Sequence, residues 1–401
     1  MMKVCFSLLW MIGLLCGMPA LAKGIDLKGI EPLQPVEYMP EAEFLDKTKK
    51  TDETPFGDLY LEYKMQLPRD WTRTVDPPKS TPDATMKRMS DRVLGIIGEY
   101  ISPPTFESRS YISIEALELD HEINARNWFV NFILAEGYAP TAMTEVSEQE
   151  VQAIYVDVQG DTSFIVRLKA IVNGPRVVLF RYYMPQENVA TERVMQAQVV
   201  KSFQLVNPET ATIESRKTFA FLDQSFFDYP ASWTAESPRL RSIDRMRAQL
   251  YTGVRRNAPD GQVTIHTISR LLDTTLADEV KAYRQKLKIP GFTLGAMIEK
   301  IQYSNADPAM EFTATEVYRL VPEDTKMRGY ELAISVMKGS EYFYIMTLIT
   351  HAREEDFYQW ARNMRAFRIM AETMRRFNDG GDDDRPEAPD MPPPAATRVT
   401  P

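Results

Sequence analysis

Residues that could do chemistry are few in this chain of 401 residues. It has only three histidines, His121, His266 and His351, and no two of them have the i, i+4 spacing of a helical metal site. Both cysteines, Cys5 and Cys16, lie close to the N-terminus. The sequence contains neither a Gly-rich phosphate loop nor a Gly-x-Ser-x-Gly nucleophile elbow. We therefore expect no enzyme activity, no cofactor and no metal site.

The three histidines fit structural roles better than ligand roles. His266 alternates with Ile265 along a predicted strand, so we expect it to point outward. His121 lies just before a predicted helix, where we expect a solvated cap region. His351 precedes the acidic residues 354–356, which suit a helix N-terminus because the helix dipole favours negative charge there.

Two acidic clusters lie at residues 354–356 and 382–384. Nothing in their spacing marks either cluster as a general acid/base pair, so we interpret both as solvated charge runs. Weak binding of a divalent cation at Asp382–Asp384 stays open, because carboxylate oxygens are the ligands that hard cations prefer.

One run of arginines opposes the net charge of the chain, which is −9. Asp244 is the only acid within this run, which consists of Arg239, Arg241, Arg245, Arg247, Arg255 and Arg256. A guanidinium group suits planar, bidentate contacts with carboxylates or phosphates. The run has two interpretations: a scattered, solvated loop, or a docking surface for an acidic partner, which could be the chain's own acidic tail.

Composition restricts the class of protein. Apolar residues make up 44% and charged residues 26%, as in soluble globular proteins. The negative net charge argues against nucleic acid as a partner, because binding to phosphates needs a positive surface. It also disfavours docking on an anionic membrane face.

The N-terminus has the pattern of a secretory signal. Lys3 is followed by an apolar run over residues 4–18, and Ala20 and Ala22 supply small residues at a cleavage site. We therefore expect export to the periplasm, with a mature chain that starts at Lys23 and contains no thiol. An uncleaved anchor is the alternative, because the apolar run nears spanning length. A lipid-anchored Cys16 is disfavoured by Leu15, where lipoprotein signals have a small residue.

A short motif occurs twice. Residues 67–72, Leu-Pro-Arg-Asp-Trp-Thr, recur as Tyr-Pro-Ala-Ser-Trp-Thr at residues 229–234. The offset between the two copies far exceeds the period of a solenoid repeat, which is roughly 20–50 residues. The sequence therefore predicts two tandem copies of one domain.

Alternation, helical stripes and turn signals predict the elements of each copy. The first copy has strands at residues 59–67, 111–119, 151–158, 163–172 and 177–183, with helices at 124–136 and 191–202. The second copy has a strand or hairpin at 219–229, strands at 263–271, 330–336 and 342–348, a helix from 276 that ends at Pro290-Gly291, and a closing helix over 357–367. Tight turns are expected at Asn173-Gly174 and Lys338-Gly339.

The two copies align at several further positions. Phe367 at the end of the second closing helix aligns with Phe203, and Gly291 aligns with Gly137, which places Tyr283 on Phe129. The aromatic residues Trp71, Trp128, Trp233 and Trp360 are expected in the core, whereas Trp10 belongs to the signal. The expected organisation is a signal peptide at 1–22, an extended leader at 23–55, a first domain at 56–207, a linker at 208–217, a second domain at 218–373 and a disordered acidic tail at 374–401.

Each repeat carries a Pro-x-x-Trp corner at Pro68/Trp71 or Pro230/Trp233, and a closing helix that ends at a phenylalanine. In this order of elements the chain resembles the PsbP-like fold of the PsbP proteins and the bacterial DcrB-type envelope proteins. The resemblance implies an α+β fold with two tandem domains, each an antiparallel sheet between helices. It also implies a binding or assembly module without an inherited active site.

Together these features predict a non-catalytic, exported protein of a bacterial envelope complex, such as a secretion or transfer machine. Its expected partners are envelope proteins, and we expect no stable membrane span after signal cleavage. The alternative is a periplasmic carrier of a small molecule or lipid, with its ligand in a cleft between the domains or under a sheet.

Overall fold

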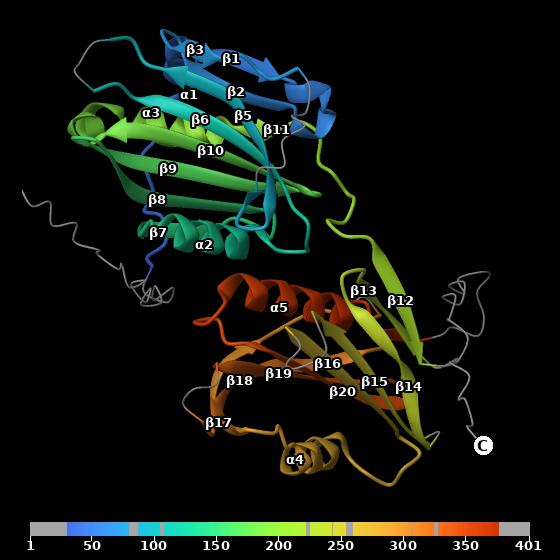
Figure 1. The fold of residues 1–401 in the computed structure, drawn as a ribbon. Helices are drawn as coiled ribbons and strands as arrows, with labels where there is room; N and C mark the ends of the chain where they lie inside the picture. The colour runs from blue at the N-terminus through green and yellow to red at the C-terminus, as the bar shows by residue number, and fades with distance from the viewer. Residues whose placement is uncertain are drawn as a thin grey trace, which may run out of the picture.

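The computed structural model describes residues 30–79, 87–104, 108–221, 225–242, 244–253, 260–305, 307–324 and 328–376. These residues form two α+β domains, one above the other in Figure 1. The predicted signal peptide and residues 377–401 of the predicted acidic tail lie outside the described residues. Residues 374–376, which were predicted to belong to the disordered tail, are instead part of the C-terminal domain: Met374 is fully buried, and β21 (Arg375–Arg376) pairs with β13 (Ser225–Pro230). Within the described part of the chain, no helix combines the length and the apolar character needed to cross a bilayer.

The N-terminal domain has a main antiparallel sheet of eight strands. Its strand order is β3-β5-β6-β10-β9-β8-β7, and β4 pairs with β5. The strands are β3 (Thr72–Val75), β4 (Lys87–Arg88), β5 (Asp91–Ile101), β6 (Tyr111–Glu118), β7 (Pro140–Glu145), β8 (Glu150–Gln159), β9 (Thr162–Asn173) and β10 (Arg176–Pro185). A smaller sheet contains β1 (Thr48–Glu53), β2 (Tyr63–Pro68) and β11 (Gln204–Leu205).

The C-terminal domain repeats this topology, except that its seven-stranded main sheet has no described counterpart of β4. Its main sheet has the order β14-β15-β16-β20-β19-β18-β17, and its small sheet has the order β12-β13-β21. The strands are β12 (Arg216–Phe221), β13 (Ser225–Pro230), β14 (Thr234–Ser242), β15 (Arg245–Thr252), β16 (Gly261–Ser269), β17 (Phe292–Ile301), β18 (Glu311–Pro322), β19 (Tyr330–Lys338), β20 (Tyr342–His351) and β21 (Arg375–Arg376). The predicted duplication is thus confirmed in the order of the strands.

Helices cover both faces of each main sheet. In the N-terminal domain α3 (Val189–Ser202) lies between the main and small sheets, and α2 (Ala125–Glu136) lies on the opposite face. In the C-terminal domain α5 (Phe357–Glu372) takes the place of α3, and α4 (Leu276–Lys286) takes the place of α2. The predicted antiparallel sheet between helices is therefore observed in both domains.

Local chemistry sets the ends of these elements as expected. The side chains of Asn124 and Thr275 accept backbone N–H groups at the starts of α2 and α4, as helix caps do. Asp356 caps α5 in the same way. Gly137 ends α2 at φ 74°, a left-handed conformation that favours glycine. Gly174, at φ 56°, closes the predicted β9–β10 turn.

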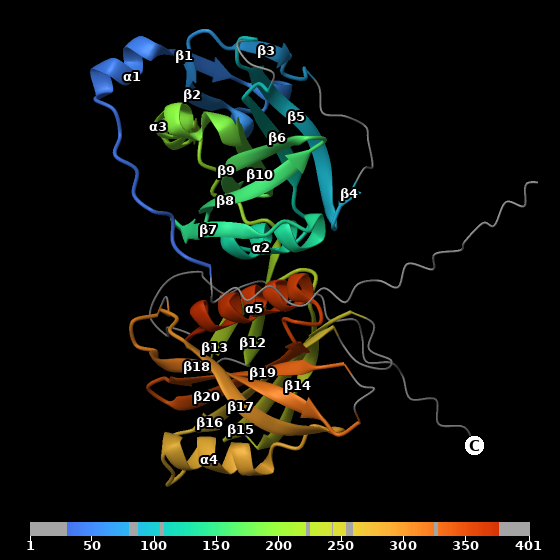
Figure 2. The same ribbon diagram turned by 90° about the vertical axis from the view of Figure 1, so that its left-hand side faces the viewer.

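The leader is shorter than the sequence predicts. Residues 41–47 form helix α1 (Glu41–Lys47), and residues 48–53 form β1, which pairs with β2, so the domain begins before residue 56. The preceding residues 30–40 also contact the N-terminal domain. The backbone N–H of Met143 in β7 donates to the Glu31 carbonyl at 2.9 Å, and Gln198 of α3 makes two hydrogen bonds with the Met39 backbone. Figure 2 shows this segment running from β7 towards α1.

Two other boundaries differ from the prediction. Residues 59–61 form a short 3-10 helix (Leu59–Leu61), and β2 begins only at Tyr63, because Asp58 caps this turn by accepting the Tyr60 N–H. Helix α4 ends at Lys286, before Pro290-Gly291. A short 3-10 helix also spans Pro55–Gly57, and another, Gln186–Asn188, leads into α3.

The four tryptophans of the described chain lie in the core, as predicted. Trp71, Trp128, Trp233 and Trp360 are all buried. The matched residues Phe203 and Phe367 are both fully buried. Phe203 is the C-cap of α3, whereas α5 continues past Phe367, its predicted end, to Glu372. The largest apolar cluster is not confined to one domain, however: it extends from α2 of the N-terminal domain to α5 and the main sheet of the C-terminal domain.

Candidate functional site: the groove at the domain seam

The two domains meet where α2 packs against α5. Helix α2 is therefore covered on both sides, by its own sheet and by α5. Its side chains Trp128, Phe129 and Phe132 are fully buried, and they share one apolar cluster with Trp360 and Phe367 of α5. A shared apolar core holds the domains as one body, because separating them would expose this surface to water.

A buried carboxylate joins the domains at this contact. Asp91 of β5 accepts a hydrogen bond from the Trp128 indole N–H at 2.8 Å and another from the Tyr358 hydroxyl of α5 at 3.0 Å. Asp91 is fully buried. Burial raises the pKa of the Asp91 carboxyl, and its two hydrogen bonds oppose that rise by stabilising the charged form.

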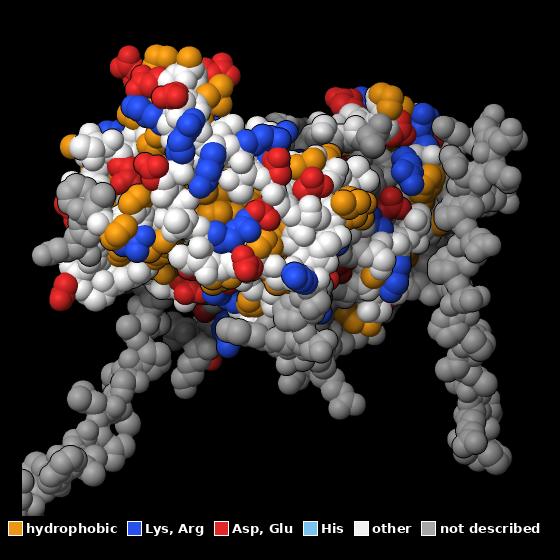
Figure 3. All heavy atoms as spheres, turned by 90° about the horizontal axis from the view of Figure 1, so that it is seen from above, with side chains coloured by type: hydrophobic (Ala, Val, Ile, Leu, Met, Phe, Trp, Pro, Cys, Tyr) orange, Lys and Arg blue, Asp and Glu red, His pale blue; other side chains and the backbone are white. Residues whose placement is uncertain are grey.

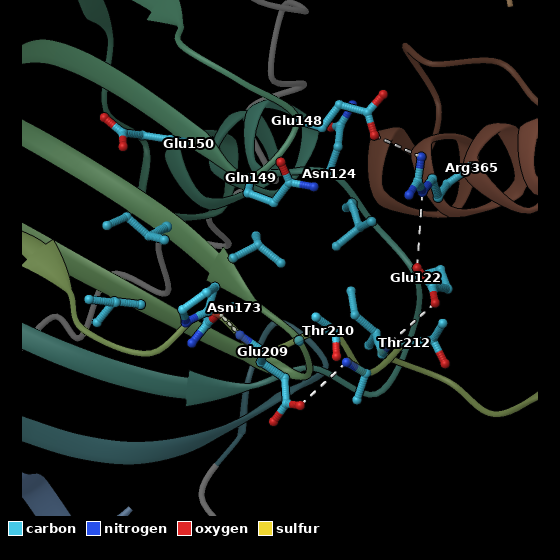
Figure 4. A pocket seen from close by; sticks show the side chains of 18 of the residues that line it. Glu122, Asn124, Glu148, Gln149, Glu150, Asn173, Glu209, Thr210, Thr212 and Arg365 are labelled. Carbon is cyan, nitrogen blue, oxygen red and sulfur yellow. Dashed lines mark hydrogen bonds and ion pairs between the residues drawn. The ribbon is translucent and has the colours of Figure 1, made fainter. Parts of the chain in front are cut away.

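A second polar contact crosses the seam beside the first. Arg365 of α5 lies 3.2 Å from Glu148 and 4.0 Å from Glu122, both on loops of the N-terminal domain. Arg368, one turn further along α5, also pairs with Glu148. Figure 4 shows Arg365 pointing between Glu122 and Glu148. Only 6% of the Glu122 side chain is exposed, so this ion pair is screened less than one on the surface.

These contacts border a groove of about 870 Å³ at the seam. Its walls are the loops before α2 and between β7 and β8, the β9–β10 turn, and the connection from β11 to β12, and α5 adds Arg365. The residues labelled in Figure 4 are Glu122, Asn124, Glu148, Gln149, Glu150, Asn173, Glu209, Thr210, Thr212 and Arg365.

The acidic groups of the groove already have partners. Glu122 accepts the Ile213 N–H at 3.1 Å, Glu150 pairs with Lys169 at 3.2 Å, and Glu209 pairs with Arg176 at 3.3 Å. A general acid or base needs a proton to exchange with a substrate, whereas these carboxylates are engaged with cations and amides of the chain itself. These ion pairs and hydrogen bonds hold the walls of the groove in place.

The connection between the domains gives the groove an accessible polar wall. Thr210 and Ala211 are exposed there, while Asn173 holds the start of this segment by accepting the Glu209 N–H at 2.6 Å and donating to the Asn207 carbonyl at 3.0 Å. The segment thus presents polar groups from a fixed backbone. A fixed cleft at a domain interface is a common place for binding sites.

The arginines predicted as a docking surface lie elsewhere, on the β14–β15 hairpin of the C-terminal domain. Arg239 and Arg241 belong to β14, Arg245 and Arg247 belong to β15, and Arg255 and Arg256 lie outside the described residues. Four of the six residues therefore lie in strands and not in a loop. Within the chain, both terminal nitrogens of Arg245 bind Glu279 of α4, at 2.6 and 2.8 Å.

The histidines also differ from their predicted surroundings. His266 lies on the face of the sheet that α4 covers, and its ring is 5.1 Å from that of Tyr283. His121 is half-buried near the seam, where burial and the nearby Arg362 lower its pKa. His351 is buried at the end of β20. No group of three or more potential metal ligands occurs among the residues that the structure describes.

Sequence reasoning missed the residues of the seam. Arg362, Arg365 and Arg368 follow each other at the i, i+3 spacing of one helix face, and that spacing was the available signal. Their partners had no local signal, since Glu148 and Arg365 are 217 positions apart in the chain. Asp91 was likewise indistinguishable from a solvent-facing acid at the start of a strand.

Comparisons with known proteins return only distant likenesses. No family model matches the chain, and no curated protein matches it. Among solved structures, the PsbP protein CyanoP from Synechocystis sp. PCC 6803 matches over 43% of this chain and 98% of its own, with 14% identity and a TM-score of 0.29. The immunity protein TplEi of T6SS from Pseudomonas aeruginosa matches over 82% of this chain and 98% of its own, with 10% identity and a TM-score of 0.22.

A structure of the Tle4–Tli4 complex matches over 78% of this chain and 96% of its own, with 10% identity and a TM-score of 0.20. The chain is thus similar at a distance to a PsbP protein and to an immunity protein of T6SS. At these identities and TM-scores, the likenesses assign neither an activity nor a partner to this chain. Its own strand order makes it a protein of two tandem α+β domains.

Proposed function

We propose that the chain is a non-catalytic, exported protein-binding component of a bacterial envelope complex of the secretion or transfer kind. The observation that carries the proposal is the groove at the seam. It is formed by two domains that a shared core holds together, and its acidic side chains are engaged within the chain. A fixed polar groove whose acids are already paired suits the recognition of a protein segment better than it suits catalysis.

Surface charge supports a protein partner over a nucleic acid. Figure 3 shows the outer face of the N-terminal domain, where Lys and Arg side chains are interspersed with Asp and Glu among scattered apolar groups. On the described part of this face, the cations do not form a continuous band. Phosphate backbones are bound by such bands, whereas a mixed surface is ordinary for protein contacts.

The groove predicts where a partner contacts the chain. A photo-reactive crosslinking residue in place of Thr210, which is exposed on the groove wall, should capture an envelope protein when the full chain is recovered from detergent-solubilised envelopes. The matched control is the same residue in place of Leu271, which is 93% exposed and belongs to the C-terminal domain, away from the groove walls. A chain that stays monomeric and uncrosslinked at Thr210 in every growth condition would contradict the proposal.

The predicted export is tested by mass spectrometry, separately from partner binding. The mature protein should begin at Lys23 and be released with the periplasmic fraction, because the residues before it have the composition of a cleavable signal. Mass spectrometry of the protein from its own host measures the start directly. A cytoplasmic protein that still begins at Met1 would reject the envelope location and leave the groove's binding role to the crosslinking result.

A further inference from the structure

The C-terminal domain contains a second cavity, under helix α4, of about 690 Å³. Its lining residues come from α4, the segment after it and the strands that α4 covers. Figure 1 shows α4 on the side of the C-terminal domain that faces away from the N-terminal domain. The volume of the cavity falls within the range of sites for small molecules, roughly 300–1,000 Å³. The cavity and the groove share no lining residue, so a ligand in this cavity is independent of the proposed protein-binding role.

Comparison with the N-terminal domain shows why the cavity exists. There the equivalent helix, α2, is pressed onto its sheet by α5, and Phe129 and Ile133 are fully buried. The aligned residues in the C-terminal domain, Tyr283 and Leu287, are less buried, and none of the 11 residues of α4 is buried. No described element covers the outer side of α4. Its side chains Val280 and Tyr283 pack against the apolar cluster of the sheet, and the cavity remains beside them.

The cavity has an apolar half. Leu332 of β19 and Ile345 of β20 lie in its floor and are already buried in an apolar cluster separate from the main core, whereas Ile349 of β20 is only half-buried. Ile289 and Phe292, which follow α4, close this half at the side. Covering such a wall with an apolar chain is favourable, because contact removes both surfaces from water.

The other half of the cavity is basic. Arg245, Arg247, Lys286 and Lys288 line it, against Glu279 as the one carboxylate among the described lining residues. Arg245 is held by Glu279, and this contact lowers the pKa of the Glu279 carboxyl. Arg247 has no carboxylate partner among the described residues. Within that part of the chain, its side chain donates to the Gln249 side-chain oxygen at 3.4 Å, and its Nε is buried without a partner.

The N-terminal domain supplies a carboxylate to its own cations at this place, although the Nε of Arg181, like that of Arg247, is buried without a hydrogen-bond partner. Glu115 of β6 accepts from Arg88 at 2.7 Å and from Arg181 at 2.9 Å, under α2. In the C-terminal domain the aligned strand position is His266 of β16, so an imidazole stands at this position in place of the Glu115 carboxylate. A carboxylate from outside the chain would take the role that Glu115 has in the first copy.

We propose that the cavity under α4 binds an amphipathic monoanion, a long-chain carboxylate, with its carboxylate on Arg247 and its tail along the half-buried side chains of Phe292 and Ile349. A guanidinium group has two parallel N–H donors that match the two oxygens of one carboxylate. Lys286 and Lys288 at the rim attract the anion, since they give the cavity the charge opposite to the ligand.

Calorimetric titration of the mature full-length chain, stripped of bound lipid, tests the proposal with dodecanoate below its micelle concentration. One dodecanoate should bind per chain, and uncharged dodecanol and cationic dodecyltrimethylammonium should bind at least about tenfold more weakly, because a hydrogen-bonded charge pair is lost. Equal binding of the three compounds, or no binding of dodecanoate to a chain with a normal melting curve, would overturn the proposal.

Variants locate the ligand. Arg247→Gln should weaken dodecanoate binding at least about tenfold without changing dodecanol binding, since only the charge contact is lost. Ala282→Trp, on the cavity side of α4, should abolish binding of both compounds by filling the space. The matched control Arg319→Gln removes an exposed guanidinium of β18 outside the cavity and should change neither.

Two results would overturn the proposal in different ways. Dodecanoate binding that survives both Arg247→Gln and Ala282→Trp would place the ligand elsewhere on the chain. Binding to vesicles of anionic phospholipid, together with no binding of dodecanoate, would assign the basic rim to a membrane surface instead of a free carboxylate. Partner capture through the groove is not affected by either result.

Discussion

Replacing Glu115 by alanine should destabilise the protein by about 3–5 kcal/mol, because removing one member of a buried ion pair leaves the other charges uncompensated. Glu115 is 4% exposed, and its carboxylate neutralises both Arg88 and Arg181 beneath α2. Urea denaturation at pH 7, followed by tryptophan fluorescence and circular dichroism, measures the change in the free energy of unfolding.

The control for this prediction is a carboxylate in an exposed pair. Glu311 pairs with Lys338 at 2.9 Å, and 71% of its side chain is exposed, so Glu311→Ala should cost under about 1 kcal/mol. Glu115→Gln keeps the shape and one acceptor and should fall between the two alanine variants. Equal losses for Glu115→Ala and Glu311→Ala would show that the buried ion cluster does not hold the sheet and the helix together.

Replacing Asp91 by alanine should cost about 2–4 kcal/mol and weaken the coupling between the domains, because each unsatisfied buried donor costs about 1–3 kcal/mol. The change leaves the indole N–H of Trp128 buried without an acceptor and removes the acceptor of the Tyr358 hydroxyl. Because Tyr358 belongs to the C-terminal domain, urea unfolding of Asp91→Ala should separate towards two transitions, whereas the wild-type chain should unfold in one.

A double-mutant cycle with Tyr358→Phe isolates the contact across the seam. Tyr358→Phe alone should cost about 1–2 kcal/mol, since it removes one hydrogen bond to a charged group. It should have a smaller effect when Asp91 is already alanine. Additive effects of the two changes would mean that the hydroxyl and the carboxylate do not stabilise each other.

The pH dependence of stability gives Asp91 a further signature. Burial raises its pKa, so the folded state binds this proton more tightly than the unfolded state does. The contribution of Asp91 to stability should therefore be largest at low pH and fall as the pH rises from the ordinary carboxyl range through the raised pKa. Asp91→Asn, which cannot titrate, should flatten this part of the stability profile.

Features set by neighbouring residues were predictable from the sequence. The two Pro-x-x-Trp corners established the duplication, and the strand orders of the domains agree with it. Asn173-Gly174 predicted a turn because glycine adopts the left-handed conformation at no steric cost. Thr275 predicted the start of α4 because its hydroxyl can accept the N–H three residues on, as it does from Asp278.

The leader shows where local composition fails. Residues 30–53 are rich in proline and charge, which predicted an extended segment, yet they contact β7 and α3 and supply a helix and a strand. Their hydrogen bonds join residues far apart in the chain, such as Met39 and Gln198, which are separated by 159 positions. Composition predicts how a segment behaves in isolation, but it does not predict the surface of the domain against which the segment packs.

The candidate sites depended on tertiary structure even more. The sequence identified the arginine run, but only the fold pairs Arg245 with Glu279 and leaves Arg247 in a cavity. Likewise, α2 and α4 occupy equivalent places in the two copies, and both have an apolar face. Helix α2 is buried by α5, whereas the outer side of α4 is exposed. The apolar pattern of the two helix sequences does not predict this difference.

The sequence by itself predicted an export signal. It also determined the duplication and most turns and helix caps, because these features depend on residues within a few positions of each other. Only the tertiary structure decided the seam, its groove and the cavity under α4. Those features come from contacts such as Glu148 with Arg365, whose partners are 217 positions apart. The free energy of such contacts depends on burial and on charges brought together by folding, and neither leaves a local pattern in the chain.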